Sequence, residues 1–255
     1  MSTFTIVVIV GIIFLIILAL YYIFIQYRAP DLKEYIDKHS SILNWVDLSD
    51  FMKNANNGDL ILMSGNTRGE RVCRYFTDSI FSHVGLLFRE IHPITGEDIL
   101  YIWDSDLGQK TKDGPRILPL KDKLSRYHGY HFLSWRKLNF SALAEKSKLS
   151  KESLNTKIRP TTENILKIVE KYKDYDFDEK MLTWWTSGGF LSLFNGFFEN
   201  KDKIFCSQLI ALTLQSEGIL NKDKKPAWYS PGSFANKIEG LNEKFDYGPQ
   251  IFSKF

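Results

Sequence analysis

Cysteine is scarce in this chain, which holds only Cys73 and Cys206 among 255 residues. Small extracellular domains normally carry more cysteines, paired in a disulfide framework. A single bridge between the two is compatible with the sequence, but two free thiols in a reducing compartment fit it better. A chain of this length, 44% hydrophobic, buries a sizeable core without such cross-links.

An excess of charge of either sign is also missing. The chain has 33 basic and 30 acidic residues, a formal net charge of +3, and the two signs are interleaved along its length. Nucleic-acid-binding domains concentrate basic residues on one face. The balance therefore predicts no nucleic-acid partner.

The N-terminus carries a long apolar run. Residues 4–25 contain no charge, and as a helix they would span roughly 33 Å, enough to cross a bilayer core of about 30 Å. A cleaved signal peptide would have a basic start, a shorter apolar run and a small-residue cleavage site, and none of these is present. We therefore expect an uncleaved single-pass anchor at 4–26, a helical stalk or linker at 27–57, and a folded domain over 58–255.

Charges beside this run predict its orientation. The flank before it has no charged side chain, whereas Arg28, Lys33 and Lys38 follow it. The positive-inside tendency therefore favours a cytoplasmic domain. Asn139-Phe140-Ser141 is a glycosylation sequon that would matter only in the opposite orientation, and we interpret it as a chance occurrence.

The distribution of apolar residues predicts an α+β fold. Expected strands are 60–63, 82–88, 99–103 and about 130–138, and expected helices are 68–81, 161–172 and 205–217. Strands in the middle with helices at either end favour a small antiparallel sheet packed against helices. Residues 140–160, rich in Lys and Ser, predict a surface excursion. The aromatic run at 184–198 is interpreted as a core-covering insertion, with an acyl pocket or a membrane-dipping segment as alternatives.

Cys206 is the strongest candidate nucleophile. Cysteine attacks as the thiolate, and a helix N-terminus stabilises an anion. Cys206 stands where the predicted helix 205–217 begins, whereas Cys73 lies in the middle of a helix between charged residues. Taken alone, a cysteine at the start of an apolar helix is more often a small buried core residue.

His83 is the candidate base. It begins an apolar strand, and alternation places its side chain on the same face as Gly85, whose small size leaves room for a ligand or another part of the chain. Standing alone, His83 would be a core histidine bonded to a backbone carbonyl. The remaining histidines are His39 in the stalk, His92 in a turn, and His128 and His131 without further ligands, so no metal site is predicted.

A third group is needed to orient the imidazole. Asp104 ends the strand that we expect to pair with the strand of His83. Asp106 lies two residues further and is an alternative. Asp104 is preferred.

Six short motifs follow one another along the chain: Gly58-Asp59-Leu60-Ile61, Ser82-His83-Val84-Gly85-Leu86, Ile102-Trp103-Asp104, Tyr175-Asp176-Phe177, Phe205-Cys206-Ser207-Gln208-Leu209-Ile210 and Ser230-Pro231-Gly232-Ser233-Phe234. The series covers roughly residues 58–240. It resembles the circularly permuted branch of the NlpC-type papain-like superfamily, which includes YiiX-like bacterial proteins, poxvirus relatives and the lecithin–retinol acyltransferase group. In that branch the histidine strand precedes the cysteine helix, as here.

The resemblance implies a permuted papain-like fold with Cys206 as nucleophile, His83 as base and Asp104 as orienting residue, without cofactor or metal. Two positions depart from the pattern: Gln208, where many relatives have glutamate, and Asp104, where glutamate or histidine is common. The expected function is a membrane-anchored cysteine hydrolase that cleaves an amide bond in a peptide or isopeptide. The alternatives are a phospholipase or acyltransferase of the same fold, and a catalytically silent tethered binding domain.

Overall fold

The structure is a computed structural model, and it describes residues 3–39, 43–65, 67–92, 94–106, 113–126, 132–140, 160–177, 203–235 and 237–254. Several expectations fall outside these ranges. They concern the aromatic run at 184–198, the two histidines at 128 and 131, and nearly all of the Lys- and Ser-rich stretch at 140–160.

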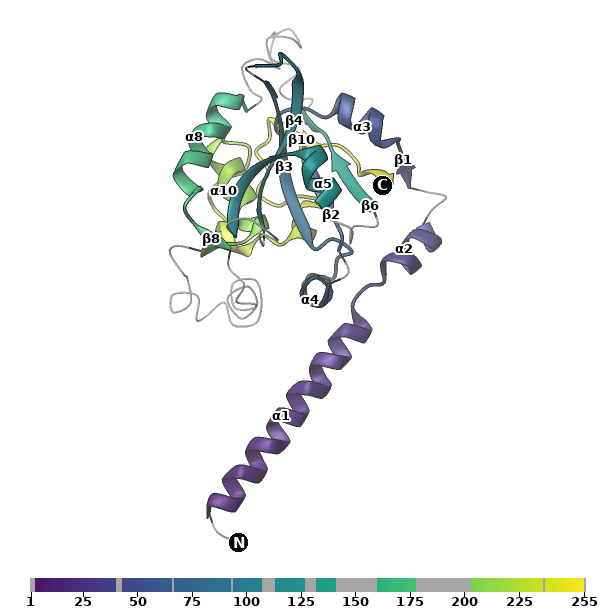
Figure 1. Cartoon of the computed structure of the whole chain (residues 1–255), viewed down its shortest axis with the longest axis vertical. Helices are drawn as coiled ribbons and strands as arrows, with labels where there is room; N and C mark the ends of the chain where they lie inside the picture. The colour runs from purple at the N-terminus through teal and green to yellow at the C-terminus, as the bar shows by residue number, and fades with distance from the viewer. Residues whose placement is uncertain are drawn as a thin grey trace.

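The described ranges contain both helices and strands (Figure 1). The helices are α1 (Thr3–Arg28), α2 (Leu32–His39), α3 (Leu48–Asn54), α4 (Arg68–Thr77), α5 (Leu120–Arg126), α8 (Thr162–Tyr172) and α10 (Cys206–Ser216), with 3-10 turns η2 (Pro226–Trp228) and η3 (Pro231–Phe234). The strands are β1 (Asn44–Trp45), β2 (Leu60–Met63), β3 (His83–Ile91), β4 (Asp98–Asp106), β5 (Gly114–Pro119), β6 (Phe132–Arg136), β7 (Leu138–Phe140), β8 (Asp176–Phe177), β9 (Lys203–Ile204), β10 (Phe245–Tyr247) and β11 (Ile251–Lys254).

Seven of these strands form one sheet in the order β1-β11-β6-β2-β3-β4-β5. Neighbouring strands are antiparallel except β1 and β11, which are parallel. The mixed α/β composition agrees with the sequence, but the sheet is larger than predicted. Alternation gives little signal in the additional strands: β1 has two residues, β5 contains Pro115 and Pro119, and β11 has four residues.

Helices cover both faces of this sheet, as Figure 1 shows. One face packs against α8 and α10 through one hydrophobic cluster, and the other packs against α3 and α5 through a second cluster. Strand β2 lies between these two clusters, which is why all four of its residues are apolar. Leu60 and Leu62 belong to the first cluster, Ile61 and Met63 to the second, and all four are fully buried.

The predicted helices 161–172 and 205–217 are confirmed as α8 and α10. The predicted helix 68–81 ends earlier, at Thr77, because Asp78 adopts a left-handed conformation with φ 46° and its N–H caps the helix. The chain then turns directly into β3.

The segment 27–57, expected as a stalk or linker, is not one continuous helix. It contains α2, then β1 paired with β11, then α3. Phe51 of α3 has no exposed surface and stacks at a tilt on Trp135, with 5.2 Å between ring centroids. Residues from Asn44 onward therefore contribute to the sheet and core of the folded domain.

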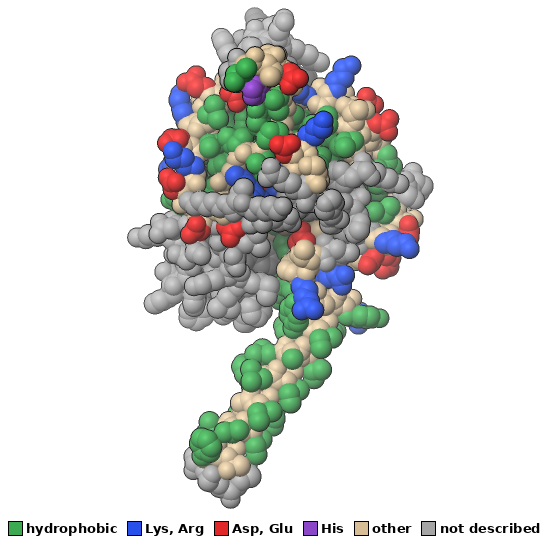
Figure 2. Space-filling model, viewed as in Figure 1, with side chains coloured by type: hydrophobic (Ala, Val, Ile, Leu, Met, Phe, Trp, Pro, Cys, Tyr) green, Lys and Arg blue, Asp and Glu red, His purple; other side chains and the backbone are tan. Residues whose placement is uncertain are grey.

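Helix α1 projects from the domain as an apolar rod (Figure 2). Its 26 residues span about 39 Å, and its large apolar side chains are exposed over nearly its whole length. Within the described ranges it is the one helix long and apolar enough to cross a membrane. Among the described residues, its last turns contact the domain: the Phe24 ring lies 6.4 Å from the Tyr75 ring, and Gln26 donates to the Arg68 carbonyl on α4.

Candidate active site

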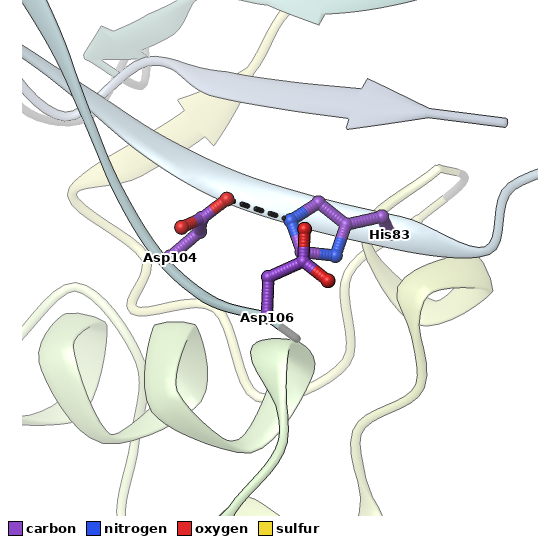
Figure 3. Close-up of side chains that lie close together, drawn as sticks. All are labelled: His83, Asp104 and Asp106. Atoms are coloured by element: carbon purple, nitrogen blue, oxygen red, sulfur yellow. Dashed lines mark hydrogen bonds and ion pairs between the residues drawn. The ribbon is translucent and has the colours of Figure 1, made fainter. Parts of the chain in front are cut away.

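The imidazole of His83 and the carboxylate of Asp104 lie next to each other beyond the paired part of strands β3 and β4. The registered pairing of β3 with β4 ends at Leu86 and Trp103, so the ends that carry His83 and Asp104 diverge. His83 Nε2 and Asp104 Oδ2 are 2.9 Å apart, and both side chains are buried (Figure 3). Since a carboxylate only accepts, the Nε2 proton is donated to Asp104, which leaves Nδ1 as the nitrogen able to accept another proton.

Cys206 is the first residue of α10, as the sequence predicts. Its position is fixed by hydrogen bonds on either side of it. The Ser105 hydroxyl donates to the Ile204 carbonyl at 2.7 Å, and the Ser207 hydroxyl donates to the Tyr229 carbonyl at 2.6 Å. Further along α10, Trp103 Nε1 of β4 donates to Thr213 Oγ1 at 3.0 Å. The helix start is thus held against the strand that carries Asp104.

The Cys206 side chain lies close enough to the His83 ring to act on its pKa through its charge and through hydrogen bonding. Burial acts to lower the pKa of His83, and the charge of Cys206 acts to raise it; the charge of Lys123 lowers it, and the hydrogen bonds to Asp104 and Cys206 raise it. The result is a pKa raised to about 10. At neutral pH the His83 ring is therefore an imidazolium when Cys206 is a thiolate. The structure brings all three predicted residues together.

Asp104 and Asp106 were both candidates for the residue that orients the His83 ring, and they make different contacts. Asp104 bonds to the His83 ring, whereas Asp106 pairs with two cations: its Oδ2 lies 2.7 Å from Lys123 Nζ and 3.2 Å from Arg116 Nη2. Lys123 Nζ also contacts Asp104 Oδ2, and Arg116 Nε lies 3.6 Å from Asp104 Oδ1. Asp104 is therefore the carboxylate that holds the ring.

The surroundings of Asp104 keep it ionised. Burial acts to raise the pKa of its carboxyl group, but the charge of Lys123, the hydrogen bond and charge of His83, and the charge of Arg116 outweigh burial. The pKa of Asp104 consequently lies far below its usual range. A permanent carboxylate fixes the tautomer of the His83 ring.

Three side chains of the site have the spacing of a metal cluster. One ligand atom each from His83, Asp104 and Asp106 lies within 4.8 Å of the others, and Figure 3 shows the three side chains gathered together. The ammonium of Lys123, however, contacts both carboxylates. A cation from the protein itself occupies the place between them, so the cluster is better described as an ion-pair network than as a metal site.

Cys73 is the second free thiol and lies near the site without joining it. Its Sγ donates to the carbonyl of Ser82, the residue before His83, at 3.7 Å. Burial raises the pKa of Cys73 far above its usual range, and the charges of Cys206 and Glu70 add to this effect. Cys73 is therefore a thiol, not a thiolate, at neutral pH.

The structure also describes the space beside Gly85 and the surroundings of His39 and His92. The space beside Gly85 is filled by the side chain of Ile102, since a Cβ on Gly85 would lie 2.5 Å from Ile102 Cδ1; another part of the chain uses the room, not a ligand. His39 and His92 have local roles, because the first bonds to the Tyr35 carbonyl and the second to the backbone N–H of Thr95.

The Gly58-Asp59 and Tyr175-Asp176-Phe177 motifs have structural roles. The buried Asp59 carboxylate accepts from Trp135 Nε1 and from the Leu138 backbone N–H, both at 2.9 Å, which ties β2 to β6 and β7. The second motif includes β8, which pairs in parallel with β9, the strand that leads into Cys206. Both motifs thus position the site without contributing a reactive group.

Lys123 and Arg116 were not anticipated from the sequence. Lys123 has no exposed surface, although it stands in the polar stretch Lys121-Asp122-Lys123. One signal was available: Lys123 follows the buried Leu120 by three residues, and residues at that spacing share a helix face. Arg116 lies directly opposite Asp104 on β5, a register that cannot be derived from local pattern.

The sequence matches no protein-family model, and a search of curated proteins finds no match.

Proposed function

We propose that this protein is a membrane-anchored cysteine hydrolase of the permuted papain-like kind, with Cys206 as nucleophile, His83 as base and acid, and Asp104 as orienting residue. One observation carries the proposal: the buried His83 ring is hydrogen-bonded to Asp104, and the Cys206 side chain, at a helix start, interacts with the same ring. A core histidine would need neither a buried carboxylate nor a thiol partner. The order of the motifs supports the same conclusion.

The reaction begins with proton transfer. His83 Nδ1 takes the thiol proton of Cys206, while the Nε2 proton stays on the hydrogen bond to Asp104. The thiolate attacks the carbonyl carbon of an amide, forming a C–S bond and placing a negative charge on the carbonyl oxygen. The backbone N–H of Cys206, at the N-terminus of α10, is the donor available for that oxyanion.

The intermediate then collapses to a thioester. The C–N bond breaks, and the imidazolium of His83 gives its proton to the leaving amine. Water, deprotonated by the neutral ring, attacks the thioester and releases the acid and the thiol. Transfer to another acceptor in place of water would give an acyltransferase by the same steps.

One contact favours a second candidate, a hydrolase or acyltransferase that acts on lipid esters. The end of α1 packs on α4 through Phe24 and Tyr75, and the same helix α4 touches the site where Cys73 donates to the Ser82 carbonyl. Helix α4 therefore connects the end of the apolar helix to the strand that begins with His83. An α-helix is about 10–12 Å across, so the site would lie close to the membrane surface.

The anchor itself is proposed as single-pass, with the domain on the cytoplasmic side. Arg28 closes α1, Lys33 and Lys38 follow it, and the side chains of Lys33 and Lys38 are exposed. In sealed membrane vesicles with the cytoplasmic face outward, added protease should degrade the domain and leave a short fragment containing α1. Protection of the whole domain would reverse the orientation.

The substrate class is tested on the full-length protein in lipid nanodiscs. We would offer peptide and isopeptide libraries in one series and phospholipid vesicles in another, and follow release of amine or lysolipid by mass spectrometry. Cleavage of amides that disappears with Cys206→Ala supports the proposal. Thiol-dependent consumption of phospholipid alone would replace it with the lipid candidate. Absence of turnover in both series, together with an unreactive Cys206, would leave a tethered binding domain.

A further inference from the structure

Lys123 is a buried charge that the reaction described above does not use. Its side chain has no exposed surface, yet its ammonium contacts Asp104 Oδ2 and lies 2.7 Å from Asp106 Oδ2. Burying an ammonium without partners is costly, and a lysine so deeply buried is nearly always paired. Two carboxylates supply that pairing here, and one of them is the carboxylate that holds His83.

The site has a charge imbalance that Lys123 partly offsets. The thiolate of Cys206 and the carboxylate of Asp104 both stabilise a positive charge on the His83 ring. A ring held too strongly in its charged form is a poor acid, because a general acid works best when its pKa is near the working pH. The positive charge of Lys123 contacts the same Asp104 oxygen that bonds the ring, and it weakens that hold.

We propose that Lys123 is a positioning residue: its ammonium, steadied by Asp106, offsets the charge of Asp104 so that His83 can give its proton to the leaving group. The inference rests on the proposed function, since only a catalytic ring needs this balance. It assigns distinct roles to the two aspartates, because Asp104 faces the ring and Asp106 secures the lysine. Arg116, which lies near both carboxylates, completes an arrangement of two anions and two cations.

The charged groups around His83 come from five elements. They are Asp104 and Asp106 of β4, Arg116 of β5, Lys123 of α5, Cys206 of α10, and Cys73 of α4, whose thiol bonds to the Ser82 carbonyl. Cys206 contributes the largest charge effect on the pKa of His83. Its removal by Cys206→Ala isolates the effect of the carboxylates and the cations.

The test measures the pKa of His83 in a Cys206→Ala background, by NMR of the full-length protein labelled with ¹³C-histidine in detergent micelles. The His83 resonance is assigned by its loss in His83→Gln. Adding Lys123→Met should raise the pKa of His83 by about one unit, because a nearby positive charge is removed. Adding Asp106→Asn should lower it by a comparable amount, because the carboxylate lies within 4.8 Å of the ring.

Opposite shifts are the decisive result, since a merely structural disturbance would not give opposite signs for two uncharged, size-matched replacements. Shifts of the same sign, or no shift in either, would overturn the role of Lys123. If Lys123→Met does not fold, Asp106→Asn remains sufficient: an unchanged or raised pKa of His83 would overturn the inference. Because the titration needs no turnover, this failure is distinct from failure of the proposed function, which is decided by activity with Cys206 intact.

Discussion

Replacing Cys206 with alanine is expected to abolish turnover while leaving the fold intact. Removing the nucleophile of a catalytic triad costs on the order of 10⁵–10⁶-fold in kcat. The substitution removes one sulfur atom from a small buried side chain, so we expect a stability loss of only about 1 kcal/mol. The measurement is kcat on the substrate found in the library experiment, with denaturant unfolding in detergent as the check on folding.

Cys73→Ala is the matched control for Cys206→Ala. Both are free thiols at partly or fully buried positions, but Cys73 bonds only to a backbone carbonyl. The Cys73→Ala variant should keep kcat within about twofold, as expected for a change outside the reacting groups. Equal activity in Cys206→Ala and wild type would refute catalysis by Cys206, and a loss confined to Cys73→Ala would assign the chemistry to Cys73.

Asp104→Asn should have the next largest effect, on activity and stability together. An asparagine can direct its NH₂ at Nε2, which would leave the proton of the ring on Nδ1, where it cannot accept the proton of Cys206. In a serine hydrolase the equivalent change lowers kcat by about 10⁴-fold. We expect a loss of about 10²–10⁴-fold in kcat/KM here. Asp106→Asn leaves the bond between His83 and Asp104 in place and should cost far less.

The stability cost of Asp104→Asn should depend on pH. Removing one partner of a buried ion pair costs about 3–5 kcal/mol, and less here because Asp106 still pairs with Lys123. The pKa of Asp104 is depressed in the folded protein, so its stabilisation is complete above the unfolded value of about 3.9 and is lost as the pH falls further. Unfolding free energies of wild type and variant should differ most near pH 7 and converge below about pH 4. A constant difference across that range would contradict the ionised Asp104.

Local pattern was sufficient for the elements that carry Cys206 and His83. Apolar spacing with Gly218 as a stop predicts α10, and Gly218 indeed has a positive φ of 68° after the last turn. The apolar strand that begins at His83 is equally evident. What joins them is not local: the contact spans more than a hundred residues, and only the order of the motifs suggested it.

The charge network could not be derived in the same way. Asp104 and Arg116 face each other only because β4 and β5 pair in one register, and a shift of one residue would place Arg116 on the other face of the sheet. Lys123 reaches the same carboxylates from α5, in a stretch whose charges read as solvated surface. Likewise, β1 and β11 are too short to show alternation, and the polar helical pattern before residue 58 predicted a helical stalk or linker instead.

The central claim is that His83 ionises Cys206, and the reaction of Cys206 with iodoacetamide at pH 6 tests it most directly. Few ordinary thiols, with a pKa of about 8.5, are thiolates at that pH. Mass spectrometry of the full-length protein gives the alkylation rates of Cys206 and Cys73 side by side, so Cys73 serves as the internal reference. The account predicts that Cys206 reacts much faster than Cys73 in wild type, and that His83→Gln slows Cys206 by at least about tenfold. An unchanged Cys206 rate in His83→Gln would contradict it.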